Sequence, residues 1–238
     1  MISETNPERS AAATAAHSLS SGSGWAPTAP RSASTTLLAL RHGETALTPE
    51  KRFSGSGGTD PELSERGRWQ ADRAAASTLL AGAGIDAVVC SPLRRCRQTA
   101  AAVARRFGLD PVVEDGLREA DFGDWEELTY EEVRARFPQD LQAWHASPRT
   151  APTGSTESFA DVARRIAEAR DRLLSRYQGR TVLAVTHVTP VKALIQLALN
   201  APGEALFAME LSPASFSGVT YTGEKASMRL YNDTSHLR

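Results

Sequence analysis

The stretch Leu37-Leu38-Ala39-Leu40-Arg41-His42-Gly43-Glu44-Thr45 joins a short apolar run to a polar turn. A continuous apolar run of this length, bounded by turn residues, is typical of a strand that is buried on both faces of a sheet. Residues 37–40 are therefore predicted to form such a strand. Arg41 and His42 follow it directly, so we expect them at its carboxyl end.

The rest of the chain alternates between short apolar runs and amphipathic stretches. Further strands are predicted over 85–90, 112–113 and 181–186, and helices over 64–80, 92–107, 129–136, 139–145, 158–177 and 190–199. Residues 215–222 and 226–231 have the pattern of a hairpin. This order predicts an α/β fold, a three-layer sandwich whose mainly parallel central sheet is flanked by helices and extended at one edge by the hairpin.

The N-terminal segment differs in composition from the rest of the chain. Ser, Thr, Ala, Gly and Pro supply 26 of its first 36 residues, and Trp25 is its one aromatic side chain among Phe, Tyr and Trp. Such a segment buries too little to offset its ordering entropy. We therefore expect a disordered Ser/Ala-rich tail or linker over 1–35 and a single folded domain over 36–238.

The charge balance excludes several classes of partner. The chain has 27 basic and 28 acidic residues, so bulk charge gives no reason to expect nucleic acid or an anionic membrane as a partner. No apolar run is long enough to span a bilayer, and no signal peptide is visible, which predicts a cytoplasmic protein. Cys90 and Cys96 have no zinc-site spacing and are expected to be reduced. The sequence predicts no cofactor and is compatible with a homodimer.

Polar residues follow several of the predicted strands. Arg41 and His42 follow the first, and Arg95 lies in the helix after the second. Glu119 lies in the loop after 112–113, and His187 follows 181–186. Because ligands of parallel α/β sheets bind outside the carboxyl ends of the strands, we expect these side chains to converge.

This set of residue types suits a phosphate ester. Arginine donates paired, charge-assisted hydrogen bonds to phosphate, and a neutral imidazole can attack phosphorus to form a phosphohistidine. A second histidine can donate to a phosphoryl oxygen, and a glutamic acid can protonate the leaving oxygen. No metal is needed, and no His-Glu-x-x-His run occurs. Each residue alone has a simpler structural role, but their placement at several strand ends favours a site.

Four stretches resemble the histidine phosphatase superfamily, also called phosphoglycerate mutase-like. They are Leu40–Thr45 with its continuation through Arg52–Gly55 and Asp60–Ala71, Ser91–Ala100, Leu117–Glu126, and Val185–His187. The resemblance covers about residues 36–235 and implies a phosphoglycerate mutase-like fold. Carried over residue by residue, it implies three catalytic and four phosphate-binding positions: His42, Glu119 and His187, and Arg41, Arg95, Arg52 and Thr48.

The resemblance assigns a role to each of these positions. It makes His42 the phosphorylated nucleophile, Glu119 the proton donor and His187 the second histidine, with no metal. Arg52 is expected at the mouth of the site, and Thr48 stands where the family often has asparagine. Three departures from the family pattern are Thr48, the pair Val188-Thr189 in place of two glycines, and Ser155-Thr156 before Glu157.

Within the family, residues 186–192 and 232–237 most resemble the acid phosphatase domain of actinobacterial bifunctional ribonuclease H/acid phosphatase proteins. Residues 1–36 supply neither a sheet nor a carboxylate cluster for a ribonuclease H domain, so this chain is expected to be the phosphatase part alone. The resemblance implies a metal-independent phosphomonoesterase of acid phosphatase type, acting through phosphohistidine on a small phosphorylated metabolite.

Three other functions are weighed against this one. An α-ribazole-phosphate phosphatase of cobalamin synthesis is the alternative. A phosphoglycerate mutase is disfavoured because Ala120 and Asp121 stand where mutases carry basic residues that hold the substrate carboxylate. An inactive phosphate-binding module is disfavoured because both histidines, both arginines and the glutamate are present.

Overall fold

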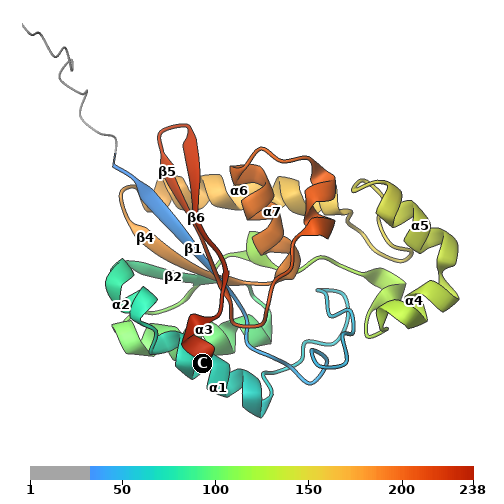
Figure 1. The fold of residues 1–238 in the computed structure, drawn as a ribbon, viewed down its shortest axis with the longest axis horizontal. Helices are drawn as coiled ribbons and strands as arrows, with labels where there is room; N and C mark the ends of the chain where they lie inside the picture. Colours follow the sequence, from blue (N-terminus) through green and yellow to red (C-terminus); the bar gives the residue numbers. More distant parts are fainter. Residues whose placement is uncertain (1–32) are drawn as a thin grey trace, which may run out of the picture. The chain divides into compact units, whose positions relative to one another are not determined.

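The computed structural model describes residues 33–238, so the expectation for the N-terminal tail falls almost wholly outside the described residues. A six-stranded sheet of order β3-β2-β4-β1-β5-β6 lies at the centre of the fold (Figure 1). The strands are β1 (Thr35–Arg41), β2 (Ala87–Cys90), β3 (Val112–Val113), β4 (Thr181–Thr186), β5 (Phe216–Thr222) and β6 (Lys225–Asp233). The first four are parallel, and β5 is antiparallel both to β1 and to β6, its partner in the hairpin. The predicted α/β sandwich with a hairpin at one edge is confirmed.

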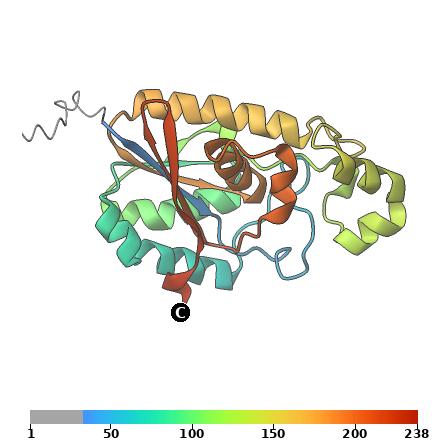
Figure 2. The same ribbon diagram turned by 45° about the horizontal axis from the view of Figure 1, so that its top comes forward.

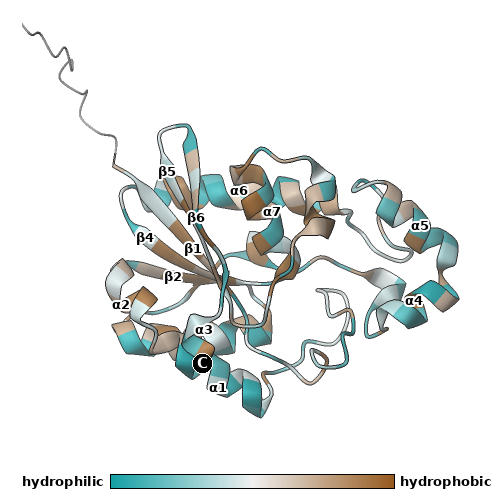
Figure 3. Ribbon diagram, viewed as in Figure 1, coloured by the Kyte–Doolittle hydropathy of each residue, from teal (hydrophilic) through white to brown (hydrophobic). Residues whose placement is uncertain are grey.

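Alternate residues of β1 face two different helix layers, as the pleat of a strand requires. Leu38 and Leu40 pack with α1 (Glu65–Ala75), α2 (Thr78–Ala83) and α3 (Arg94–Phe107). Leu37 and Ala39 pack on the opposite face with α6 (Phe159–Arg176) and α7 (Val188–Ala198). Figure 2 shows the two layers, and Figure 3 shows the apolar strands between them.

A pair of short helices, α4 (Tyr130–Arg136) and α5 (Pro138–Ala146), lies beyond the carboxyl ends of the strands (Figure 1). Thr129 caps α4 together with Glu132, each side chain bonding the other's backbone N–H. Proline at the first position of α5 suits a helix start, because its missing N–H would have no partner there. Trp144 of α5 lines the site described below.

Three predicted boundaries were wrong. The helix predicted over 64–80 is two helices, because the hydroxyl of Ser77 accepts the Leu80 N–H and starts α2. Helix α3 begins at Arg94 rather than at Pro92, since Leu93 is extended and serves as the N-cap. Helix α7 begins at Val188, which places Pro190 inside its first turn, where proline is tolerated.

The sequence analysis also made predictions about membrane spans and about the two cysteines. Within residues 33–238, no helix is both long and apolar enough to cross a membrane. Cys90 and Cys96 are free thiols, and both are buried.

Candidate active site

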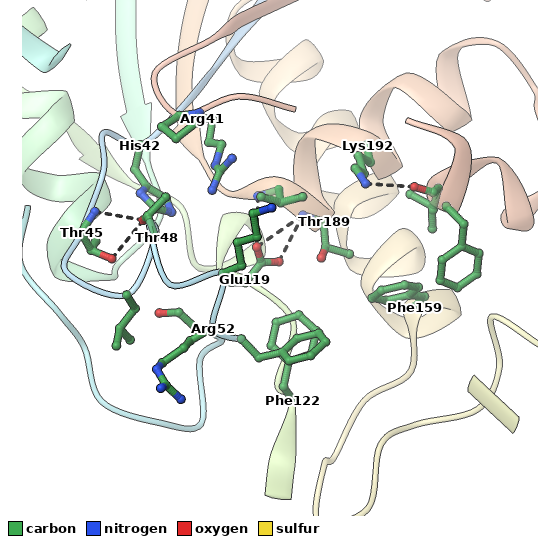
Figure 4. A pocket seen from close by; sticks show the side chains of 18 of the residues that line it. Arg41, His42, Thr45, Thr48, Arg52, Glu119, Phe122, Phe159, Thr189 and Lys192 are labelled. Carbon is green, nitrogen blue, oxygen red and sulfur yellow. Dashed lines mark hydrogen bonds between the residues drawn. The ribbon is translucent and has the colours of Figure 1, made fainter. Parts of the chain in front are cut away.

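A cavity of about 470 Å³ opens at the carboxyl ends of β1 and β4 (Figure 4). One part of its wall is polar and the other part is aromatic. The polar part includes Arg41, His42, Thr48, Glu119 and Thr189. The aromatic part, which we call the aromatic chamber, consists of Phe53, Phe122, Trp144, Phe159 and Phe207.

Two glycines hold the loop after β1 against α1. A Cβ atom on Gly43 would collide with the carbonyl of Gly67, and a Cβ on Gly67 would collide with that of Glu44. The loop is also fastened by hydrogen bonds from the Glu44 N–H to Gln70 Oε1 (2.8 Å) and from the Ser64 N–H to the Glu44 carbonyl (2.9 Å). This close backbone packing fixes the residue that precedes Gly43, which is His42.

His42 is buried, with 6% of its surface exposed. Its Nδ1 lies 2.7 Å from the carbonyl oxygen of Gly43, which can only accept, so Nδ1 carries the proton and Nε2 keeps a free lone pair. Burial, and then the charges of Arg95 and Arg41, lower the pKa of His42 well below its ordinary value. The ring is therefore neutral at pH 7, which is the state a nucleophilic nitrogen needs.

Two arginines surround His42, and each has an unmet hydrogen-bond donor. Arg95 is fully buried and donates to the carbonyls of Ser54 (2.9 Å) and Gly55 (3.2 Å). Arg41 donates to the carbonyl of Leu211. The Nε atoms of both arginines are buried without an acceptor among the residues that the structure describes. Since an unpaired buried donor costs about 1–3 kcal/mol, both guanidinium groups are suited to receive an oxyanion.

Glu119 is buried with its carboxylate at the start of α7. Its oxygens accept the N–H groups of Val188 (3.0 Å) and Thr189 (3.2 Å), and that of its neighbour Ala120 (2.8 Å). The first N–H groups of a helix have no partner within the helix and attract negative charge. The carboxylate therefore occupies the N-terminus of α7 in the free structure, beside the cavity (Figure 4).

His187 lies next to His42 but does not line the cavity. It is fully buried, and its ring centroid is 5.0 Å from that of His42 in an edge-on arrangement. Its Nε2 lies 2.7 Å from Ser91 Oγ and 3.3 Å from Cys96 Sγ. Burial, and then the charge of Arg95, lower the pKa of His187 well below its ordinary value, so this ring is also neutral at pH 7.

Thr48 and Arg52 line the cavity, but their polar groups are already engaged. Thr48 Oγ1 accepts the Thr45 N–H at 3.0 Å. Arg52 pairs with Glu50 and with Glu132, whose Oε2 lies 2.9 Å from its Nη1. Its Nε and Nη1 are therefore engaged, and Nη2 is the nitrogen through which Arg52 can bind phosphate without breaking these pairs. The pairing with Glu132 ties the loop after β1 to the capped start of α4.

Sequence reasoning missed Ser54, Lys192 and the aromatic chamber, all of which line the cavity, whereas it had singled out Thr189, which also lines it. Lys192 lies on α7 five residues after its N-cap His187, a spacing that does not share a helix face, so no local pattern pointed to it. Among residues 33–238, no group of three or more His, Cys, Asp or Glu side chains is placed to hold a metal ion.

Arg165, on α6, fixes the loop that carries Glu119. It donates to the carbonyls of Gly116 (3.0 Å), Arg118 (2.7 Å) and Glu119 (2.9 Å). Its Nη2 also lies 2.6 Å from a carboxylate oxygen of Glu157. The side chains of Arg165 and Glu157 are only 13% and 9% exposed, so the pair is shielded from solvent.

Replacing Arg165 by alanine is expected to destabilise the fold and loosen Glu119. Breaking a buried ion pair costs about 3–5 kcal/mol, and slight exposure reduces this to about 2–3 kcal/mol. For a domain of this size that corresponds to a fall in Tm of roughly 5–10 °C, measurable by thermal denaturation. Arg164→Ala is the matched control, because Arg164 is 69% exposed and pairs only within its own helix. Equal Tm values for the two variants would contradict this role of Arg165.

The fold and the site define a phosphoglycerate mutase-like α/β protein in which two histidines and two arginines meet at the edge of a sheet. The chain belongs to the histidine phosphatase superfamily: residues 37–234 match branch 1 of that family.

Similar proteins carry several different names. The chain is 45% identical over 215 residues to a Mycobacterium tuberculosis protein described as bifunctional, a match that covers 90% of this chain and 57% of that protein. It is 30% identical over 201 residues to phosphoserine phosphatase 1 of Hydrogenobacter thermophilus, covering 84% and 93% of the two chains. The solved structure of a mycobacterial glucosyl-3-phosphoglycerate phosphatase superposes with a TM-score of 0.74 at 32% identity, covering 84% and 99%. The chain thus spans little more than half of the bifunctional relative.

Proposed function

We propose that this chain is a metal-independent phosphomonoesterase of acid phosphatase type, working through phosphohistidine on a small phosphorylated metabolite. One observation carries the proposal: the neutral His42, with Nε2 unprotonated, lies within reach of the charges of Arg41 and Arg95, and each arginine has a buried Nε–H donor that is unmet. The family membership of residues 37–234 and the phosphatase names of similar proteins support it.

In the first step Nε2 of His42 attacks phosphorus, the P–N bond forms and the P–O ester bond breaks. The electron pair leaves with the ester oxygen, which takes a proton from the Glu119 carboxyl group. Arg41 and Arg95 neutralise the phosphoryl oxygens. The arriving dianion competes with the Glu119 carboxylate for the N–H groups at the start of α7.

In the second step water attacks the phosphohistidine. Glu119, now ionised, takes a proton from this water while the P–N bond breaks. His42 returns to its neutral state, inorganic phosphate leaves, and Glu119 is again protonated for the next turnover. His187 lies beside His42 and is placed to steady the charge that the nucleophile gains.

The structure weakens one argument against a mutase. The Asp121 carboxylate accepts the N–H groups of Gly123 (3.0 Å) and Thr156 (2.9 Å) and does not line the cavity, so it does not repel a substrate carboxylate there. No basic residue takes its place within that loop. α-Ribazole phosphate remains the alternative substrate, because the aromatic chamber suits a flat base.

Purified protein is expected to release phosphate from simple phosphomonoesters equally fast with and without EDTA. The charge of the phosphoryl group is met by arginines, so a divalent ion has no task in the steps above. The measurement is phosphate release from a panel that includes p-nitrophenyl phosphate, glycerol 2-phosphate and α-ribazole phosphate. Activity that is lost in EDTA and restored by magnesium or zinc would contradict the mechanism.

A further inference from the structure

Lys192 is a cation in the cavity wall that the proposed chemistry does not use. Its ammonium donates to the carbonyl of Leu206 at 3.0 Å, which leaves two of its three N–H donors for other partners. Within residues 33–238, no carboxylate lies close enough to form an ion pair with it. Burial lowers its pKa, and the charges of Glu119 and Arg41 act on it in opposite directions.

A partly buried ammonium without a carboxylate partner is a costly feature in the empty cavity. Removing charge from water is unfavourable unless a counter-charge or hydrogen bonds replace the water. The phosphoryl group does not supply this counter-charge, because Arg41 and Arg95 already meet it. In Figure 4, Lys192 and Phe159 lie across Glu119 from His42, on the side that a leaving group would occupy.

The aromatic chamber adjoins Lys192. The ring of Trp144 lies 4.8 Å from that of Phe159 and 4.9 Å from that of Phe207, so these three side chains form one packed wall. Leu206, whose carbonyl accepts from Lys192, lines the same cavity directly before Phe207. The cation and the aromatic wall are therefore joined through one short segment, Gly203–Ala208. Lys192 and these rings thus line one cavity.

We propose that Lys192 binds a carboxylate on the leaving alcohol of the substrate, while the aromatic chamber packs against a ring of the same alcohol. This inference rests on the proposed phosphatase function and defines its substrate class: a phosphomonoester whose alcohol carries both an anionic group and a flat, apolar part. An ammonium in a cavity of low polarity prefers an anion to a neutral acceptor of the same shape.

The test compares 3- and 4-carboxyphenyl phosphate with the corresponding carboxamides, and includes phenyl phosphate. We expect wild-type kcat/KM to favour the carboxylate of at least one isomer over its carboxamide by about tenfold or more, the scale of a charge-assisted hydrogen bond. Lys192→Met should bring this ratio down at least fivefold, and Lys192→Arg should restore most of it. Because both esters are measured in every variant, their differing leaving-group acidities cancel.

The other two lysines of the chain provide the controls. Lys225, exposed at the start of β6, is far from the cavity in sequence and fold, and Lys225→Met should keep the wild-type ratio. Lys51 lines the same cavity. If the carboxylate-to-carboxamide ratio of kcat/KM falls in Lys51→Met but not in Lys192→Met, the carboxylate is bound by Lys51, and the inference is overturned.

The chamber is tested separately with Phe207→Ala. We expect kcat/KM for phenyl phosphate, relative to that for glycerol 2-phosphate, to fall about tenfold, since truncating an aromatic contact removes packing from the ring alone. An equal loss of kcat/KM on both esters would contradict the proposed packing of the aromatic chamber against the substrate ring. Hydrolysis of phenyl phosphate without any carboxylate preference would overturn the Lys192 inference alone, whereas no hydrolysis of any ester would overturn the proposed function itself.

Discussion

Replacing His42 by alanine is expected to abolish phosphate release while leaving the fold intact. Without a nucleophilic nitrogen the covalent route disappears, and removing a nucleophile lowers kcat by about 10⁴-fold or more. The imidazole makes its one side-chain hydrogen bond to the carbonyl of its neighbour Gly43 and adjoins an existing cavity. The free energy of unfolding should therefore fall by no more than about 1–2 kcal/mol. Steady-state phosphate release and thermal denaturation of the same preparation measure the two effects.

Trapping of the intermediate provides a second readout for His42. Quenching the native enzyme during turnover of a ³²P-labelled ester should yield acid-labile label on protein, and this label should be absent from His42→Ala. His145→Ala, which removes an exposed histidine of α5, should keep the label. Near-native turnover by His42→Ala, or label on another residue, would show that the mechanism proposed here is wrong.

Glu119→Gln is expected to slow the hydrolysis of alkyl phosphates far more than that of p-nitrophenyl phosphate. An alkoxide leaves poorly without a proton, and general acid catalysis contributes about 10²–10⁴-fold, whereas p-nitrophenolate leaves unaided. The glutamine oxygen can still accept the N–H groups of Val188 and Thr189, so the loop should keep its place. The measurement is kcat/KM for glycerol 2-phosphate and for p-nitrophenyl phosphate in both proteins.

The ratio of the two losses decides the role of Glu119. A loss at least tenfold larger on the alkyl ester identifies Glu119 as the proton donor. Equal losses on both substrates would mean that Glu119 acts only by holding the start of α7, and the proton would then come from another group. Thermal denaturation of Glu119→Gln separates either outcome from a general loss of structure.

The elements that carry the site residues were predictable because their signals are local. The apolar runs of β1 and β4 are each followed by a histidine, and parallel strands place their carboxyl ends together, so the meeting of His42 and His187 followed from sequence. The apolar face of α6 was equally visible, since Phe159, Val162 and Ile166 recur at helical spacing and are buried. The Ser77 cap was missed because the preceding residues continue to favour helix.

Other features of the site were decided only by tertiary structure. Arg52 pairs with Glu132, which is 80 residues away, and Arg165 donates to the carbonyl of Glu119, which is 46 residues before it. No local sequence pattern predicts contacts over such separations. His187 lies beneath His42 rather than in the cavity wall because Ser91, from the end of another strand, binds its ring. Lys192 and the aromatic chamber come together through the packing of α5, α6 and α7. The sequence alone therefore determined which strand-end residues meet, because their positions follow from local patterns, whereas the shape of the cavity around Lys192 and the aromatic chamber depends on long-range packing between helices.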